Sequence, residues 1–283
     1  MLALLRVLAS GSSGNACFLE VGGVRVLVDA GLTLPRLTRA LRELDCAPAD
    51  LDAVLITHEH SDHVRGLAEL RAAVPALPIH ATPATARAVD GVCGPVVDRP
   101  NLEHGVPLEI GPLRALPFRV DHDAADPVGY RLAAGDFAMA VATDLGDDTP
   151  VIRRAMVDCR ALVLEANHDE DLLARGPYPV FLKRRVASRR GHLSNRQAAQ
   201  LVAAVAGPRL EHVVLCHLSE SNNSPERAEQ AVRSALRRRH SHVQVVAAER
   251  HRPGPVMRFE VAAGIPRPVV LEPGRAVQQP RLF

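Results

Sequence analysis

The chain has 283 residues, 47% of them hydrophobic and 23% charged, which is the composition of an ordinary globular protein with one or two domains. Its formal net charge of +2 at pH 7 excludes a globally basic nucleic-acid-binding protein, so any such binding requires a local patch. The five cysteines form no CxxC pair and no apolar run approaches the ~20 residues of a membrane-spanning helix, so we expect a cytoplasmic protein without disulfides, thiolate zinc sites or membrane partners.

Short β-branched runs alternate with helical patterns along the chain. In the first half, strands are predicted over residues 5–9, 17–21, 24–28 and 53–56 and from Ile79, and helices over 35–44 and 64–74. Gly22-Gly23 indicates a hairpin turn between the second and third strands. The second half begins with a strand-rich stretch over residues 107–120, 128–133 and 138–142. Helices are then predicted over 151–157, 197–205 and 225–238, and strands over 161–164, 212–216 and 243–247.

Strands and helices mixed in two successive halves predict one α/β domain over residues 1–265, with sheets inside and helices outside. We find no internal repeat and no low-complexity linker that would divide this domain. Residues 266–283 are rich in Pro and Arg, and we expect a loosely packed C-terminal tail there.

A cluster of potential metal ligands follows the strand over residues 53–56. His58 and His60 are two residues apart in an extended segment, so both can face one ion. Ser61 is expected to cap the following helix, with Asp62 and His63 in its first turn. Four potential ligands within six residues predict a metal-binding loop.

The same arrangement recurs later in the chain, where three more apolar strands each lead to one potential ligand. These ligands are His122, Asp144 and His217. Five His and two Asp exceed the needs of one tetrahedral ion but fit two ions bridged by a carboxylate. Imidazole and carboxylate donors suit two divalent ions, Zn²⁺ or Mn²⁺, with Fe as a further option.

This pattern, His58-x-His60-x-Asp62-His63 followed by the three later ligands, resembles the metallo-β-lactamase superfamily over nearly the whole chain. The resemblance implies a four-layer αββα sandwich with the site at the edge between two sheets. The ligands that it implies are His58, His60 and His122 for one metal, Asp62, His63 and His217 for the other, and Asp144 as the bridge.

Narrower matches resemble the YycJ/WalJ-like branch of that superfamily, which implies DNA exonuclease activity. The matching segments are residues 8–15, Asp29-Ala30-Gly31, 57–63, 121–125, Glu165-Ala166-Asn167-His168-Asp169, Gly191-His192-Leu193-Ser194-Asn195 and 217–219. Ala166 stands where Ser is expected, which is an exchange of one small residue for another.

Several residues outside the ligand set are candidates for substrate binding. Asn167 and His168 follow another apolar strand, although they could form a simple polar turn. His192 and Ser194 precede a predicted helix whose N-terminus favours a phosphate, although Ser194 could act only as its cap. Ser12 and Asn15, in a turn rich in Gly and Ser, are further candidates, and that turn is a weak phosphate motif by itself.

One dense basic run precedes His192 and contains Lys183, Arg184, Arg185, Arg189 and Arg190. Such a run is usually a solvated face, but beside a phosphate site it suits contact with a nucleic-acid backbone. Tyr178 and Phe181 could stack against bases or pack in the core.

We therefore hypothesise a dinuclear metal-dependent hydrolase that uses a metal-bound hydroxide and acts as a phosphodiesterase, in particular a 5′–3′ DNA exonuclease. Asp62 would accept a proton, and His192 would contact the scissile phosphate or protonate the leaving oxygen. DNA is favoured over RNA as the partner, and a homo-oligomer is left open. The alternatives are a hydrolase of a small cyclic phosphodiester, thioester, lactone or β-lactam, and a catalytically silent, metal-stabilised regulatory module.

Overall fold

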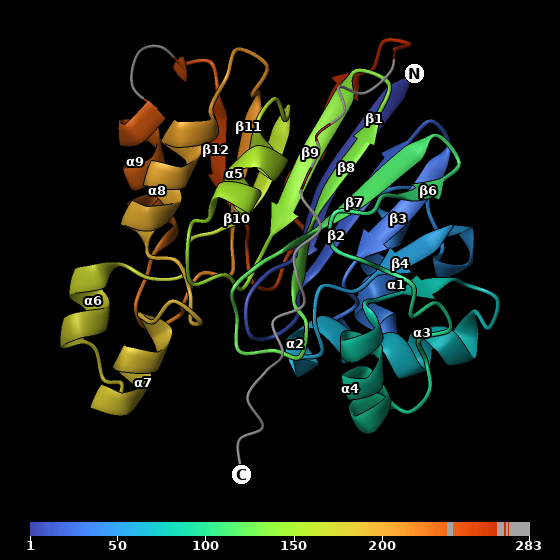
Figure 1. Cartoon of the computed structure of the whole chain (residues 1–283), viewed down its shortest axis with the longest axis horizontal. Coiled ribbons are helices and arrows are strands. Elements are labelled where there is room, and N and C mark those ends of the chain that lie inside the picture. The colour runs from blue at the N-terminus through green and yellow to red at the C-terminus, as the bar shows by residue number, and fades with distance from the viewer. Residues whose placement is uncertain (237–239, 265–268, 270, 272–283) are drawn as a thin grey trace.

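The computed structural model describes residues 1–236, 240–264, 269 and 271. Two β-sheets pack face to face, and helices cover the outer face of each, so the chain has four layers (Figure 1). This architecture confirms the predicted αββα sandwich. Among the described residues, no helix is both long enough and apolar enough to cross a membrane.

The first sheet has six strands in the order β13-β1-β2-β3-β4-β5. They are β1 (Leu2–Ala9), β2 (Ala16–Val21), β3 (Val24–Val28), β4 (Ala53–Leu55), β5 (Ile79–His80) and β13 (Met257–Glu260). The pairs from β13 to β3 are antiparallel, and β3, β4 and β5 are parallel. Gly22 and Gly23 join β2 to β3 with φ angles of 60° and 83°, the left-handed values that a two-residue hairpin turn requires, as the sequence predicted.

The second sheet has seven strands in the order β12-β11-β10-β9-β8-β7-β6. They are β6 (Leu108–Ile110), β7 (Leu113–Arg119), β8 (Val128–Ala134), β9 (Phe137–Ala142), β10 (Ala161–Glu165), β11 (His212–Cys216) and β12 (Gln244–Ala247). The strands from β9 to β12 are parallel, and β6 to β9 form an antiparallel meander. The carboxyl ends of β7, β9, β10 and β11 therefore lie at one edge of the sheet.

Helices pack on both outer faces. Those on the first sheet are α1 (Leu34–Arg42), α2 (Ser61–Val64), α3 (Leu67–Ala73) and α4 (Pro83–Cys93), with a 3₁₀ turn, η1, at Pro48–Asp50. Those on the second sheet are α5 (Pro150–Met156), α8 (Asn195–Val205) and α9 (Pro225–Leu236). The remaining two, α6 (Glu170–Arg175) and α7 (Val180–Val186), form a lobe at the lower left of Figure 1.

The apolar core has three layers because successive residues of a strand face opposite sides of the sheet. In β10, Val163 packs between the two sheets, whereas Leu162 and Leu164 pack under the helices. Burial of both faces explains why the central strands read as continuous hydrophobic runs.

The predicted helix over residues 64–74 is interrupted in the structure. It consists of α2 and α3, separated at Gly66, whose N–H donates to the Ala30 carbonyl oxygen at 2.8 Å. A Cβ at position 66 would lie 1.9 Å from the Leu32 carbonyl oxygen, so only glycine permits this approach. Tertiary contact therefore overrides the helical periodicity here.

The other predicted elements agree with the structure to within a few residues. No element was predicted for the helices α4, α6 and α7, for the 3₁₀ turn η1 or for the short strand β13. The predicted helix over 225–238 is α9, and residues 237–238 lie outside the described part of the chain. The predicted tail over 266–283 also lies outside it, except for Val269 and Leu271.

Candidate metal centre

The segment after β4 brings two histidines to the edge between the sheets. His60 is the N-cap of α2, which begins at Ser61, so the prediction that Ser61 caps this helix was wrong by one residue. The His60 side chain makes no capping bond and turns instead toward the neighbouring imidazoles. Asp62 and His63 lie in the first turn of α2, as predicted.

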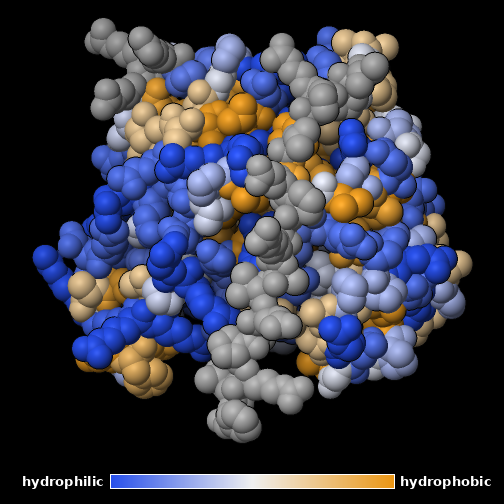
Figure 2. Space-filling model, viewed as in Figure 1, coloured by the Kyte–Doolittle hydropathy of each residue, from blue (hydrophilic) through white to orange (hydrophobic). Residues whose placement is uncertain are grey.

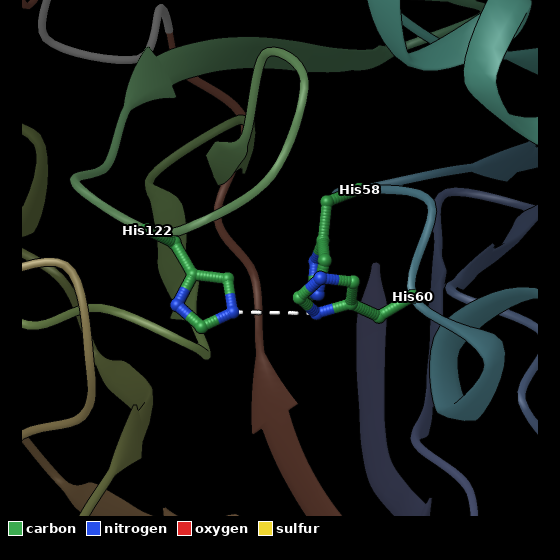
Figure 3. A group of neighbouring side chains, drawn as sticks. All are labelled: His58, His60 and His122. Atoms are coloured by element: carbon green, nitrogen blue, oxygen red, sulfur yellow. Dashed lines mark hydrogen bonds between the residues drawn. The ribbon is translucent and has the colours of Figure 1, made fainter. Parts of the chain in front are cut away.

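Three imidazoles from the two halves of the chain converge at this edge. Figure 3 shows His58 and His60 approaching from one side and His122, which follows β7, from the other. Nε2 of His122 lies 3.4 Å from Nδ1 of His60. The ring centroid of His58 lies 4.6 Å from that of His60 and 5.2 Å from that of His122. The three rings can therefore share one ion.

A second group lies beside the first and contains Asp62, His63 and His217. Oδ2 of Asp62 lies 3.4 Å from Nε2 of His217 and 3.6 Å from Nε2 of His63. These two triads are the ones that the resemblance implied for the two metals.

Asp144, which follows β9, lies between the triads. Its Oδ2 is 3.0 Å from Nε2 of His63, and its Oδ1 is 3.6 Å from Nε2 of His217 and 3.9 Å from Nε2 of His122. Asp144 and His217 have φ angles of 54° and 55°, which non-glycine residues rarely adopt. Strained backbone of this kind is tolerated where the fold must aim a side chain at a site.

The orphaned atoms and the donor chemistry of the site fit metal ions. Nε2 of His58 and Oδ2 of Asp144 are buried without any well-directed hydrogen bond, an arrangement that is costly unless a cation binds them. Imidazole nitrogen and carboxylate oxygen are the donors that divalent transition metals prefer. Both triads and Asp144 offer these donors, so the site suits divalent cations.

Each buried imidazole presents Nε2 to the site because its Nδ1 has another partner. Thr57 Oγ1 lies 3.0 Å from Nδ1 of His58, and the Gly191 carbonyl lies 3.2 Å from Nδ1 of His122. Partners of this kind fix the tautomer and the orientation of a metal-binding ring.

Two buried carboxylates perform the same task for the remaining histidines. Asp29, directly after β3, accepts from Nδ1 of His63 at 2.7 Å and from the N–H of Thr57 at 2.8 Å. Glu165, the last residue of β10, lies 2.7 Å from Nδ1 of His192 and 3.1 Å from Nδ1 of His217. Both carboxylates are almost fully buried, at 2% and 0% exposure.

Asp29 and Glu165 both lie in the segments that carry the family resemblance, but no role was predicted for either. The signal that could have found them is the one that identified Asp144, since each is a carboxylate at the end of an apolar strand. They contact the Nδ1 atoms of their histidines, whereas Asp144 lies on the Nε2 side, a distinction that depends on the packed structure.

Burial and neighbouring charge shift the pKa values of the site in opposite directions. Burial holds the pKa of His58 well below its usual value. Burial also opposes protonation of His217, but the Asp144 carboxylate and hydrogen bonds to Asp62 and Glu165 raise its pKa to about 10. In His192 the Glu165 carboxylate likewise outweighs burial and raises the pKa. The metal-free site therefore holds protons that cations would displace.

The predicted substrate-binding residues near the metals have different surroundings. Nδ2 of Asn15 lies 3.0 Å from Oδ2 of Asp62 and 3.0 Å from Nε2 of His63, and Ser12 is exposed in the preceding turn. Asn167 donates to the His217 carbonyl at 2.8 Å. These amides orient the ligands, and Ser12 is open to solvent.

Two further predicted residues, His168 and Ser194, are almost fully buried, at 2% and 1% exposure. Nδ1 of His168 has no hydrogen-bond partner among the described residues. The Ser194 hydroxyl is the N-cap of α8, since it accepts from the Gln197 N–H at 3.2 Å and donates to Glu170 at 3.0 Å. A capping role accounts for Ser194 without a substrate.

The basic run forms α7 and the turn after it, beside the metal centre. Nε of Arg185 lies 2.9 Å from Oδ2 of Asp123, whose Oδ1 lies 3.2 Å from Nε2 of His122. Nζ of Lys183 donates to the Ala174 carbonyl at 2.7 Å. The guanidinium of Arg184 makes no hydrogen bond or ion pair with any residue that the structure describes.

Comparison with known proteins gives a consistent result for most of the chain. Residues 24–218 match the family model described as the β-lactamase superfamily domain. The chain is 37% identical over 226 residues to exodeoxyribonuclease WalJ of Streptococcus pneumoniae strain D39, covering 78% of this chain and 84% of that protein. It is 34% identical over 232 residues to exodeoxyribonuclease YycJ of Bacillus anthracis, covering 81% and 88%.

Solved structures show the same fold at low sequence identity. The metallo-β-lactamase fold protein YhfI of Bacillus subtilis matches with a TM-score of 0.69 and 16% identity, covering 91% of this chain and 99% of that one. Zn²⁺-bound PqqB of Methylobacterium extorquens matches with a TM-score of 0.63 and 16% identity, covering 89% and 99%.

Proposed function

The chain belongs to the β-lactamase superfamily, and on that premise we propose that it is a two-metal phosphodiesterase that removes nucleotides from the 5′ end of DNA. The observation that carries the proposal is the pair of ligand triads with Asp144 between them. One buried carboxylate within reach of both triads is what a bridged pair of ions requires.

Zn²⁺ or Mn²⁺ fits the donor set, and Fe is a further option. One ion would be held by His58, His60 and His122, the other by Asp62, His63 and His217, with Asp144 shared. When bound, two such cations polarise a phosphoryl oxygen and lower the pKa of water.

The chain's own residues supply the proton transfers. Although burial opposes ionisation of Asp62, its hydrogen bond from His217 keeps the pKa of the carboxyl below the usual value, so Asp62 is ionised at neutral pH and can accept a proton. Glu165 engages Nδ1 of His192 and raises the pKa of that ring despite its burial. His192 can therefore remain protonated and donate from Nε2 to the leaving oxygen.

Two observations support DNA as the substrate. The basic side chains of α7 lie next to the metal centre and suit a phosphate backbone. Relatives that are 37% identical to this chain over 226 aligned residues are named exodeoxyribonucleases.

The test is cleavage of linear duplex and single-stranded DNA, labelled at either end, by metal-loaded protein. Release of mononucleotides from the 5′ end is expected, with closed circular DNA left intact and Asp62→Asn inactive. Preference for a cyclic phosphodiester, thioester or lactam would replace the proposal with a small-molecule hydrolase. Failure to cleave DNA, RNA and bis(p-nitrophenyl) phosphate would refute the phosphodiesterase.

A further inference from the structure

Helix α7 exposes apolar side chains that the rest of the chain does not cover. Val180 is 65% exposed and Phe181 is 74% exposed, the two highest values among the large hydrophobic residues that the structure describes. The same helix buries Val186 to 9% exposure, so it has one face packed inward and a second apolar face open to solvent. An exposed Phe is uncommon on a chain with so few aromatic residues, and adjacent exposed apolar residues point to a partner.

The exposed face is also strongly basic. The segment from Arg175 to Arg190, both ends included, contains six basic residues and no acidic one. Residues three and four apart in a helix are neighbours, so Phe181 lies one turn from Arg184 and Arg185. Since Arg184 has no ionic partner among the described residues, its charge is available to a ligand. The lower left of Figure 2, over α7, shows hydrophobic atoms bordered by strongly hydrophilic ones.

This face is continuous with the metal centre. Arg185 binds Asp123, which is adjacent in sequence to His122. Arg190 Nη2 reaches the His122 carbonyl at 3.5 Å, and His192 follows two residues later. A chain lying along α7 would therefore arrive at His192 and the metal ligands.

We propose that α7 binds an unpaired DNA strand, with Phe181 stacking on a base while Arg184, one turn away on the same helix, contacts a backbone phosphate beside it. The basic side chains favour a polyanion as the ligand. The exposed aromatic ring favours a strand whose bases are not already stacked in a duplex. The inference rests on the proposed function, and it specifies that the enzyme receives a single-stranded end.

The test compares the binding of two probes to full-length, metal-loaded protein by fluorescence anisotropy. One probe is a short oligothymidylate with phosphorothioate linkages that resist cleavage, and the other is an abasic strand of the same length and charge. Phe181→Ala should weaken oligothymidylate binding about 10-fold and leave abasic binding unchanged, because stacking requires a base. Phe181→Trp should restore binding.

Arg184→Ala should weaken both probes equally and lower the dependence of log affinity on log salt by about 0.7, the value for one phosphate of a single strand. Val92→Ala and Arg87→Ala on α4 are matched controls, since both residues are exposed and lie on another helix. They should bind both probes like the wild type.

If Phe181→Ala loses affinity equally for both probes, or for neither, Phe181 does not stack on a base. Unchanged oligonucleotide binding together with dissociation of an oligomer in Phe181→Ala would assign the face to self-association instead. Hydrolysis of bis(p-nitrophenyl) phosphate does not need α7, so it tests the phosphodiesterase separately from this inference.

Discussion

The two sheets contribute to the metal centre in different ways. The first sheet supplies His58, His60, Asp62 and His63 from one continuous segment that runs from the end of β4 into α2. The second supplies His122, Asp144 and His217 from the ends of three separate strands. The first set depends on the local geometry of one turn, whereas the second forms only when β7, β9 and β11 are correctly ordered. Convergence of all seven side chains therefore depends more on the assembly of the second sheet than on that of the first.

The two buried carboxylates that contact the histidines, Asp29 and Glu165, differ in the same way. Asp29 accepts from His63 and Thr57, which are both on the first half of the chain. Glu165 accepts from His192 and His217 and also from the backbone N–H groups of Leu145 and Leu193, at 3.0 and 3.2 Å. Asp29 thus orients one candidate ligand, whereas Glu165 links the candidate ligand His217 to the proposed proton donor His192.

Replacing Asp144 should have the largest effect, because this residue joins the two halves. Asp144→Asn should lose at least one bound ion and reduce phosphodiesterase activity by more than the ~10- to 100-fold that loss of a supporting residue costs. Metal content by mass spectrometry and turnover measure this. Asp148→Asn, in the same loop but paired with Arg153, is the control. Full metal content and activity in Asp144→Asn would contradict the assigned bridge.

The supporting carboxylates should differ in pH dependence rather than in metal affinity. Asp29→Asn and Glu165→Gln should each weaken metal binding about 10- to 100-fold, measured by competition with a chelator. Only Glu165→Gln should also move the alkaline limb of the pH–rate profile to lower pH. The reason is that Glu165 raises the pKa of His192 against the opposing effect of burial, and a general acid acts only while protonated.

An identical shift in Asp29→Asn would show that the two carboxylates are equivalent. No shift in either variant would remove His192 from the role of proton donor.

Metal binding should release protons, chiefly from His217 and His63. Burial disfavours the charged rings, but neighbouring carboxylates raise the pKa of His217 to about 10 and hold that of His63 well above its usual value. The protonated rings stabilise the metal-free protein fully below the unfolded pKa of about 6.5, and this contribution is lost as the pH rises toward the folded value.

Metal affinity should therefore increase with pH over that interval. Calorimetry in buffers of different ionisation enthalpy counts the released protons. A pH-independent affinity would show that both rings are already neutral in the metal-free protein.

Replacing helix-capping residues should have the smallest effects. These variants distinguish residues that stabilise the fold from residues that contact the substrate. Thr82 caps α4 on the first half, and Ser194 caps α8 on the second. Each Ala variant should lower the free energy of unfolding by about 1 kcal/mol, measured by urea denaturation. Because the Ser194 hydroxyl is buried and fully paired, KM should not change in either variant. A raised KM confined to Ser194→Ala would instead support the substrate contact predicted from sequence.

The sequence was sufficient wherever the deciding interactions are local. The β-branched strand segments, the Gly22-Gly23 hairpin and the ligand cluster that runs from the end of β4 into α2 each depend on residues close together in the chain. Strand ends also pointed to His122, Asp144 and His217, because an apolar strand followed by a ligand is visible without knowing its neighbours.

Tertiary structure decided how those strand ends are used. Asp29 and Asp144 look alike in sequence, yet Asp29 binds the remote nitrogen of His63 and Asp144 faces the Nε2 side of the same ring. The break at Gly66 likewise follows from contact with Ala30 and Leu32 rather than from the local pattern. The order of the strands in a sheet determines which strand ends lie next to one another. That order depends on packing between residues far apart in sequence. The sequence alone therefore pointed to the candidate ligands, and the fold determined which atoms contact and orient them.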